Sequence, residues 1–93
     1  MKVIVTGYLA ELAGGGELQF NAEDYQDLSL RNFLDSFLFE NYSALKPRII
    51  NEKGCLREHI AVFVDSSRIR QLDDRLVIDA ESEIYILPAL SGG

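Results

Sequence analysis

The chain has 93 residues, of which 47% are hydrophobic and 26% charged, a composition typical of a globular domain rather than of a disordered or membrane-embedded chain. Nine Lys and Arg against fifteen Asp and Glu give a formal net charge of −6, which repels nucleic acids and anionic membranes. The single cysteine excludes an internal disulfide and a cysteine-rich zinc site. We therefore expect one cytoplasmic domain without a signal peptide or spanning helix. Its acidic surface suits either solubility or a basic protein partner.

The N-terminal residues predict a β-hairpin. Met1–Leu9 (MKVIVTGYL) is rich in β-branched residues, Gly14–Gly16 is a strong turn signal, and Glu17–Phe20 resumes an alternating pattern. The glycine run lacks the Lys-Ser/Thr of a phosphate-binding loop and joins two predicted strands rather than a strand and a helix. We therefore predict a hairpin turn here and no phosphate site.

An amphipathic helix follows the hairpin. Leucine and aromatic residues recur at i, i+3, i+4, i+7, i+8 and i+12 and form one apolar stripe, which comprises Leu30, Phe33, Leu34, Phe37, Leu38 and Tyr42. Asp27 or Ser29 can cap the N-terminus of this helix, and we expect the helix to end near Asn41.

The segment Ser43–Glu58 contains Pro and Gly and is predicted to connect the helix to the next strand through a short helical turn. Ile49 and Ile50 are expected to pack against the core from this segment.

Two further strands are predicted from apolar residues at His59–Asp65 and Glu83–Leu87, and Arg68–Ile69 can add a short strand between them. The element order is therefore β-β-α-β-β, an α+β fold with a single main helix. The first and last strands of such a chain can lie side by side in the middle of a mixed sheet while the helix crosses one face. This is the ubiquitin-like β-grasp arrangement.

Strand alternation separates a core face from an outer face. The predicted core residues of the strands are Val3, Val5, Ile60, Val62, Val64, Ile84 and Ile86. Residues of the other parity are Ile4, Tyr8, Phe63, Tyr85 and Leu87. The short chain leaves no element to cover this second set, so it forms either a docking surface or ordinary exposed apolar area.

Residues typical of catalysis or of metal binding are scarce. Cys55 and His59 form a C-x3-H pair that needs two more ligands before it can hold a metal. No Ser, His and Asp set stands out, and the carboxylates are scattered along the chain. We therefore assign structural roles to Cys55 and His59 and expect no bound cofactor.

The C-terminal residues are the most distinctive part of the sequence. Pro88 is expected to stop the last strand, which divides the chain into a domain of residues 1–87 and a flexible tail of residues 88–93 (PALSGG). At about 3.3 Å per residue the tail reaches ~20 Å, enough to enter another protein's active site. Gly92 and Gly93 have no Cβ, so this end can thread a narrow channel.

A carboxylate is unreactive until activated. A partner that uses ATP-Mg could adenylate Gly93, after which a sulfur or amine nucleophile displaces AMP. A frayed terminus without function is the alternative.

The stretches Asn51–Arg70, Asp79–Ile86 and Leu87–Gly93 resemble the MoaD/ThiS family of ubiquitin-like sulfur carrier proteins, and the residues Glu11–Gly14 are similar too. The resemblance implies a β-grasp body and a Gly93 that is adenylated by an E1-like enzyme and converted to a thiocarboxylate. The sulfur then passes to a biosynthetic enzyme. The chain would be a carrier rather than an enzyme, or the small subunit of a sulfur-transferring synthase.

The resemblance leaves the pathway open. Family members often have Gly-Asp before the last strand, where this chain has Ala80-Glu-Ser82, and Gly after the central strand, where it has Ser66-Ser67. Its ending resembles both the molybdopterin (MoaD-like) and the cysteine (CysO-like) branches, which we favour over the thiamin branch. A modifier conjugated to lysines through Gly93, an autonomous enzyme and a plain interaction module are the other hypotheses. The residues expected to contact partners are Ile4, Phe63, Tyr85, Leu87, Pro88, Leu90 and Ser91.

Overall fold

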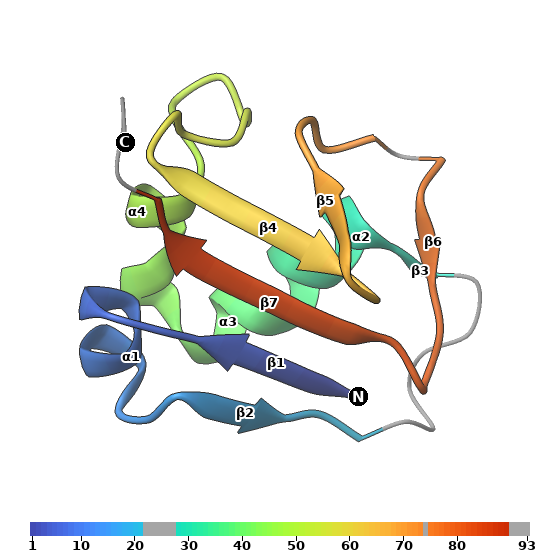
Figure 1. Ribbon diagram of the computed structural model, residues 1–93, viewed down its shortest axis with the longest axis horizontal. Coiled ribbons are helices and arrows are strands. Elements are labelled where there is room, and N and C mark those ends of the chain that lie inside the picture. Colours follow the sequence, from blue (N-terminus) through green and yellow to red (C-terminus); the bar gives the residue numbers. More distant parts are fainter. Residues whose placement is uncertain (22–27, 74, 90–93) are drawn as a thin grey trace.

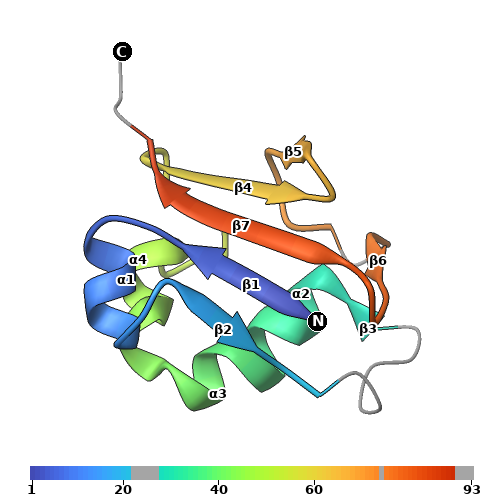
Figure 2. The ribbon, with the colours of Figure 1, turned by 60° about the horizontal axis from the view of Figure 1, so that its bottom comes forward.

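The computed structural model describes residues 1–21, 28–73 and 75–89. It contains a five-stranded mixed sheet in the order β2-β1-β7-β4-β5 (Figures 1 and 2). The strands are β1 (Lys2–Val5), β2 (Glu17–Gln19), β4 (Ile60–Val64), β5 (Ser67–Ile69) and β7 (Glu83–Pro88). The first and last strands are parallel neighbours at the centre, so the β-grasp prediction is confirmed.

The pairing register fixes which side chains share a face. Ile4 of β1 lies opposite Tyr85 of β7, and Phe63 of β4 lies opposite the same tyrosine from the other side. The intervening residues point to the helices. All seven predicted core residues of the strands are buried, with exposed fractions from 0% to 8%. The predicted strand parity is therefore confirmed.

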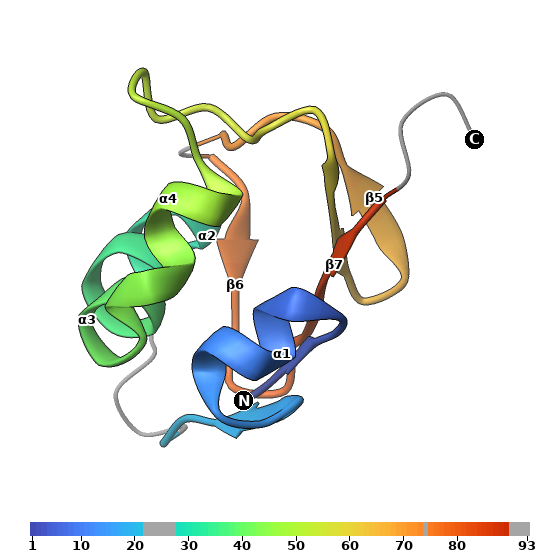
Figure 3. The same ribbon diagram turned by 90° about the vertical axis from the view of Figure 1, so that its left-hand side faces the viewer.

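The main helix crosses one face of the sheet, as Figure 3 shows. It runs through α2 (Leu30–Phe33), a π-helical turn, η2 (Leu34–Leu38), and α3 (Phe39–Asn41), so it ends where the sequence predicts. Ser29 is the N-cap: its Oγ accepts a hydrogen bond of 3.1 Å from the backbone N–H of Asn32. The other candidate cap, Asp27, lies outside the described residues.

The helical stripe and Phe20 form the aromatic part of the core. Phe33 is fully buried, and its ring meets Phe20 edge-on with a centroid separation of 5.1 Å. Phe33 also stacks on Phe37 at 5.9 Å. The connecting segment then forms η3 (Ser43–Leu45) and α4 (Lys46–Ile49), and both Ile49 and Ile50 are buried. The prediction for these two isoleucines is confirmed.

The prediction of an opening hairpin is confirmed for the pairing of the two strands but is wrong for the segment that connects them. β1 and β2 are antiparallel, yet the strand ends at Val5, and the predicted strand residues Tyr8 and Leu9 begin a helix, α1 (Tyr8–Ala13). The helix buries Leu9 against the core. It ends in a Schellman motif, in which the N–H of Gly15 donates to the carbonyl of Ala10 at 3.0 Å. The glycine run thus terminates a helix before β2 begins.

A small second sheet was not predicted. It pairs β3 (Leu28–Ser29) with β6 (Val77–Ile78) in antiparallel orientation. The backbone N–H of Leu30 also donates to the carbonyl of Leu76 at 2.8 Å, so this pairing anchors the start of the main helix. Within the described residues, no helix is long and apolar enough to span a membrane.

Candidate functional site: the outer sheet face and the root of the tail

Four of the residues expected to contact partners lie on the sheet face opposite the main helix. We call Ile4, Phe63, Tyr85 and Leu87 the docking face; they come from the adjacent strands β1, β4 and β7. Ile4, Phe63 and Leu87 are half-buried and Tyr85 is 40% exposed. In Figure 3 the helices α2, α3 and α4 lie on the other side of the sheet. No described element covers the docking face.

Tyr8 was expected on this face, and that prediction is wrong. Because the chain leaves the sheet after Val5, Tyr8 belongs to α1 and lies at one end of the sheet, where it is 43% exposed. Strand alternation does not extend through Gly7, whose φ of +60° turns the backbone out of the extended conformation.

The docking face has an apolar centre and a charged rim. Phe63, Tyr85 and Leu87 line a shallow hollow of about 320 Å³ together with Ser66. The Tyr85 hydroxyl donates a hydrogen bond of 2.9 Å to Glu83 Oε1 at the rim. This hydrogen bond, together with the negative charge of Glu83, raises the pKa of Tyr85 above its ordinary value. The hydrogen bond thus fixes the Tyr85 hydroxyl at the rim of the docking face and leaves its ring in the apolar centre.

The rim also contains an ion pair across the β1–β2 edge. Lys2 Nζ lies 3.7 Å from Glu17 Oε1, and both side chains are exposed. Pairs of this kind contribute little to stability. They surround the apolar centre with charges that a partner surface can match.

The tail leaves the sheet at a well-defined point. The prediction that Pro88 stops the last strand is wrong by one residue, because β7 includes Pro88, which pairs with Ile60 of β4. A proline is tolerated here because the last partner of β7 on the β1 side is Val5, opposite Ile86, so Pro88 has a neighbouring strand on one side only. The next N–H, of Ala89, donates to the carbonyl of His59 at 2.7 Å.

Gly7 packs against Pro88, where the tail leaves the sheet. A Cβ built on Gly7 would lie 3.2 Å from Pro88 Cγ, a contact tighter than a side chain tolerates without displacement of its neighbour. The absence of a side chain lets the loop between β1 and α1 pack directly on Pro88. The root of the tail, Pro88 and Ala89, is therefore held between Gly7 and His59. Leu90, Ser91, Gly92 and Gly93 lie outside the described residues.

The described residues bring no further metal ligand to Cys55 and His59. Both residues are exposed, and Cys55 is a free thiol. Among the residues that the structure describes, no group of three or more His, Cys, Asp and Glu side chains comes close enough together to hold a metal ion. The backbone of His59 instead anchors the tail root through its bond to Ala89.

Solved structures share this fold over the whole chain. The small archaeal modifier protein 1 (SAMP1) of Methanosarcina acetivorans is 31% identical, with a TM-score of 0.73 over 99% of this chain and 94% of that chain. SAMP1 of Haloferax volcanii is 25% identical, with a TM-score of 0.75 over 100% and 98%. A chain of the BexX/CysO complex of Amycolatopsis orientalis is 21% identical, with a TM-score of 0.76 over 99% and 98%. No protein-family model and no curated protein matches the sequence.

The central parallel pair of first and last strands, with one main helix across one face, defines a ubiquitin-like β-grasp protein. Its structural neighbours are small carriers and modifiers. The chain belongs to the MoaD/ThiS-like family of ubiquitin-fold sulfur carriers and modifiers, as the sequence resemblance predicts.

Proposed function

We propose that this protein is a sulfur carrier whose Gly93 carboxylate is adenylated by an E1-like enzyme and then converted to a thiocarboxylate. The observation that carries the proposal is the Gly92-Gly93 dipeptide placed shortly after the central strand β7 of a chain with this fold. The proposal requires Gly93 to bear a free α-carboxylate.

The activation chemistry belongs to the partner enzyme. A carboxylate oxygen of Gly93 attacks the α-phosphorus of Mg-bound ATP, pyrophosphate leaves, and an acyl adenylate forms. A hydrosulfide-equivalent nucleophile then attacks the carbonyl carbon, so a C–S bond forms, the C–O bond to AMP breaks and one proton is released. The resulting thiocarboxylate sulfur is donated to a biosynthetic acceptor, in a pathway of the molybdopterin or the cysteine type.

The protein itself supplies a fixed root and a slender reach. The packing of Pro88 on Gly7 and the hydrogen bond between Ala89 and His59 hold the root in place. Residues 89–93, which follow β7, span at most about 17 Å beyond the sheet at ~3.3 Å each. Gly92 places no Cβ beside the reacting carboxylate, which suits a narrow active-site channel.

The docking face is proposed to seat the activating enzyme and the acceptor, with Pro88, Leu90 and Ser91 extending the contact along the tail. Its support is that an uncovered apolar centre with a charged rim is typical of a protein interface. Leu87 also lies directly before the root, so a partner bound here is positioned to receive the tail. The chain of the BexX/CysO complex was crystallised with a partner, which is the behaviour we propose for this protein.

A protein modifier is the second candidate. It would use the same activated Gly93 but form an isopeptide bond with a lysine amine. This candidate is favoured by the 31% identity to a protein named as a small archaeal modifier. Covalent adducts on cellular proteins, detected by mass spectrometry as Gly-Gly remnants on lysine, would support the modifier role over the carrier role.

The test of activation is ATP–pyrophosphate exchange by the E1-like enzyme from the same organism. Wild type should support exchange, and deletion of Gly93 should abolish it. Gly92→Val should be nearly as damaging, because a β-branched side chain stiffens the segment and crowds the channel. Thermal melts of both variants should match wild type, since the changes lie beyond β7. Full exchange by the Gly93 deletion would show that the Gly93 carboxylate is not the group that is activated.

A further inference from the structure

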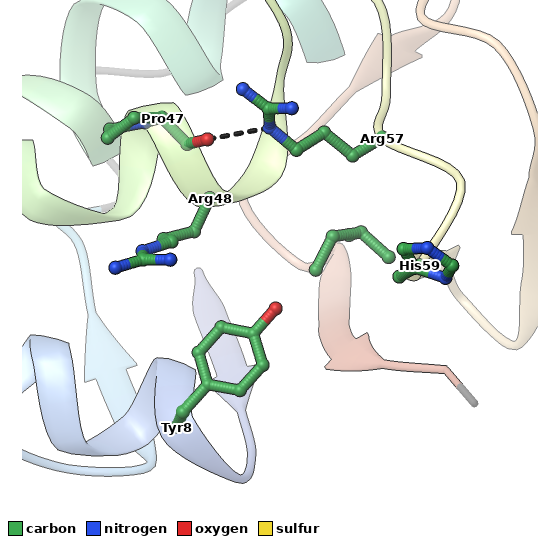
Figure 4. A pocket seen from close by; sticks show the side chains of 6 residues that line it. Tyr8, Pro47, Arg48, Arg57 and His59 are labelled. Atoms are coloured by element: carbon green, nitrogen blue, oxygen red, sulfur yellow. Dashed lines mark hydrogen bonds between the residues drawn. The ribbon is translucent and has the colours of Figure 1, made fainter. Parts of the chain in front are cut away.

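A second hollow lies beside the root of the tail and carries positive charge in an otherwise acidic protein. It has a volume of about 430 Å³, which falls in the ~300–1,000 Å³ range of ligand sites. Figure 4 shows Tyr8, Arg48, Arg57 and His59 around it, with Pro47 joined to Arg57 by a hydrogen bond. We call these five residues, with Ile60, the basic pocket.

The pocket is assembled from three parts of the chain that are distant in sequence. Tyr8 comes from α1, Pro47 and Arg48 from α4, and Arg57 from the segment before β4. In Figure 1, α1 and α4 lie at the same end of the sheet as the end of β7. The fold, rather than a local motif, therefore brings the charges together.

Among the residues that the structure describes, neither Arg48 nor Arg57 has an acidic partner. No ion pair joins Arg48 or Arg57 to a carboxylate in the described part of the chain. Arg57 Nε donates a hydrogen bond of 2.7 Å to the carbonyl of Pro47, which holds the guanidinium in place and leaves its terminal NH₂ groups to other acceptors. An adjoining hollow shares Pro47 and Arg57 with the pocket and is also lined by Lys46 and Glu52, so it adds one positive and one negative charge beside the pocket. Glu11 lines a neighbouring hollow that shares Tyr8 and Arg48 with the pocket, and it forms no ion pair with Arg48.

This local charge opposes that of the whole chain, which is −6. Guanidinium groups bind carboxylates in a bidentate geometry, and the Tyr8 hydroxyl adds a neutral donor at the same opening. The pocket therefore fits one or two carboxylate side chains.

The position of the pocket identifies where those carboxylates come from. His59 lines the pocket with its side chain and holds the tail root with its backbone carbonyl. An occupant thus lies next to the point where the tail leaves the sheet. The phosphates of ATP react at Gly93, four residues beyond Ala89 and about 13 Å further along an extended tail at ~3.3 Å per residue, so an extended tail keeps them away from the pocket. A protein segment beside the channel entrance is the occupant that fits this position.

We infer that the basic pocket binds an acidic segment, containing Asp or Glu side chains, of the enzyme that activates the tail. The inference rests on the proposed function and adds a second contact to it: the docking face positions the body, and the basic pocket fixes the direction in which the tail enters the channel. The surface of this partner is basic where it faces the acidic body and acidic where it meets α4.

The test compares charge reversals at matched positions. Arg48→Glu is the principal variant, because Arg48 is exposed and its side chain forms no hydrogen bond or ion pair with the described residues; Arg48→Lys keeps the charge. Arg75→Glu is the control: Arg75 is exposed, makes the same change in net charge and lies shortly before β6, which Figure 1 places at the opposite end of the sheet from α4. The change also breaks the exposed ion pair of Arg75 with Asp73, which contributes little to stability. Calorimetry measures the Kd of each variant for the E1-like enzyme without ATP, and pyrophosphate exchange measures KM and kcat.

We expect Arg48→Glu to weaken the Kd by about tenfold or more and to raise the KM similarly, with kcat at saturation unchanged. Arg48→Lys should recover most of the loss, and Arg75→Glu should stay within about twofold of wild type. Replacing the contacting carboxylate of the enzyme with Arg should restore binding to Arg48→Glu.

Three results would overturn the inference: equal Kd values for Arg48→Glu and Arg75→Glu, a fall in kcat with no change in Kd, or no binding of wild type. Binding that depends on Arg48 without any pyrophosphate exchange would refute the proposed function and leave the pocket as a docking site. Exchange that depends on Gly93 but is indifferent to Arg48 would retain the function and refute the pocket.

Discussion

Phe63→Asp places a charge at the centre of the docking face and tests whether that face binds partners. Phe63 is half-buried, lies opposite Tyr85 on one side and opposite Arg68 on the other, and points away from the main helix. A fully buried Phe loses about 3–5 kcal/mol on truncation. The lateral contacts of Phe63 across two strands are worth about 0.2–1 kcal/mol each. Because Asp also has a lower strand propensity than Phe, we expect Phe63→Asp to lower the free energy of unfolding by about 1–2 kcal/mol.

The effect on binding should be larger than the effect on stability. A central apolar contact in an interface contributes ~2 kcal/mol or more, and the new carboxylate would be desolvated on binding. A loss of ~2 kcal/mol corresponds to roughly a 30-fold weaker Kd. The expected signature is therefore a folded protein that binds its activating enzyme poorly.

Calorimetric titration with the E1-like enzyme and urea unfolding measure the two quantities on the same samples. Val77→Asp is the matched control, because Val77 is an apolar residue that is 56% exposed on β6, away from the docking face. Val62, the residue before Phe63, is fully buried, so Val62→Asp places a charge in the core and should unfold the protein. An equal loss of affinity for Phe63→Asp and Val77→Asp would refute the docking face, and unfolding by Phe63→Asp would refute its placement outside the core.

Three further predictions concern the turn at Ser66, the pKa of Tyr85 and the net charge of the chain. Ser66 has a φ of +72°, so Ser66→Gly should raise the free energy of unfolding by about 0.5–1 kcal/mol in denaturant titrations, and a decrease would show that the turn is unstrained. An ultraviolet pH titration should give Tyr85 a pKa above its ordinary value, because the neutral phenol donates a hydrogen bond to Glu83 and the Glu83 carboxylate opposes a phenolate. The stability that this hydrogen bond contributes is present below the ordinary tyrosine pKa and is lost as the pH rises through the raised pKa. Glu83→Gln should lower the pKa of Tyr85. The association rate with the activating enzyme should fall as salt rises while dissociation changes little, because the chain carries a charge of −6; a flat rate would assign the acidic surface to solubility alone.

Strong periodicity explains why most of the fold is predictable from the sequence. The six-residue stripe from Leu30 to Tyr42 specifies one helical face, and Ser29 specifies where that helix begins. Alternation in Ile60–Val64 and Glu83–Pro88 specifies which side of each strand is buried. These signals are local, and the tertiary structure agrees with them.

The features that were missed have weak or non-local signals. Tyr8–Ala13 is a single helical turn and a half directly after a β-branched run, too short to show a period of its own, and only the capping by Gly14 and Gly15 marks its end. β3 and β6 have two residues each, too few for alternation. The basic pocket depends on the convergence of α1, α4 and the start of β4, which no linear motif encodes.

The most direct test of the central claim is the intact mass of the protein produced together with its own E1-like enzyme and a sulfur source. Replacement of one carboxylate oxygen by sulfur should add about 16 Da, and the added mass should localise to the C-terminal peptide that ends at Gly93. Gly92→Val, produced in the same way, should show the unmodified mass. The contradicting result is a wild-type protein that ends at Gly93 and remains entirely unmodified, although the E1-like enzyme hydrolyses ATP and binds the wild-type protein. That result would refute the assignment of Gly93 as the sulfur-carrying residue.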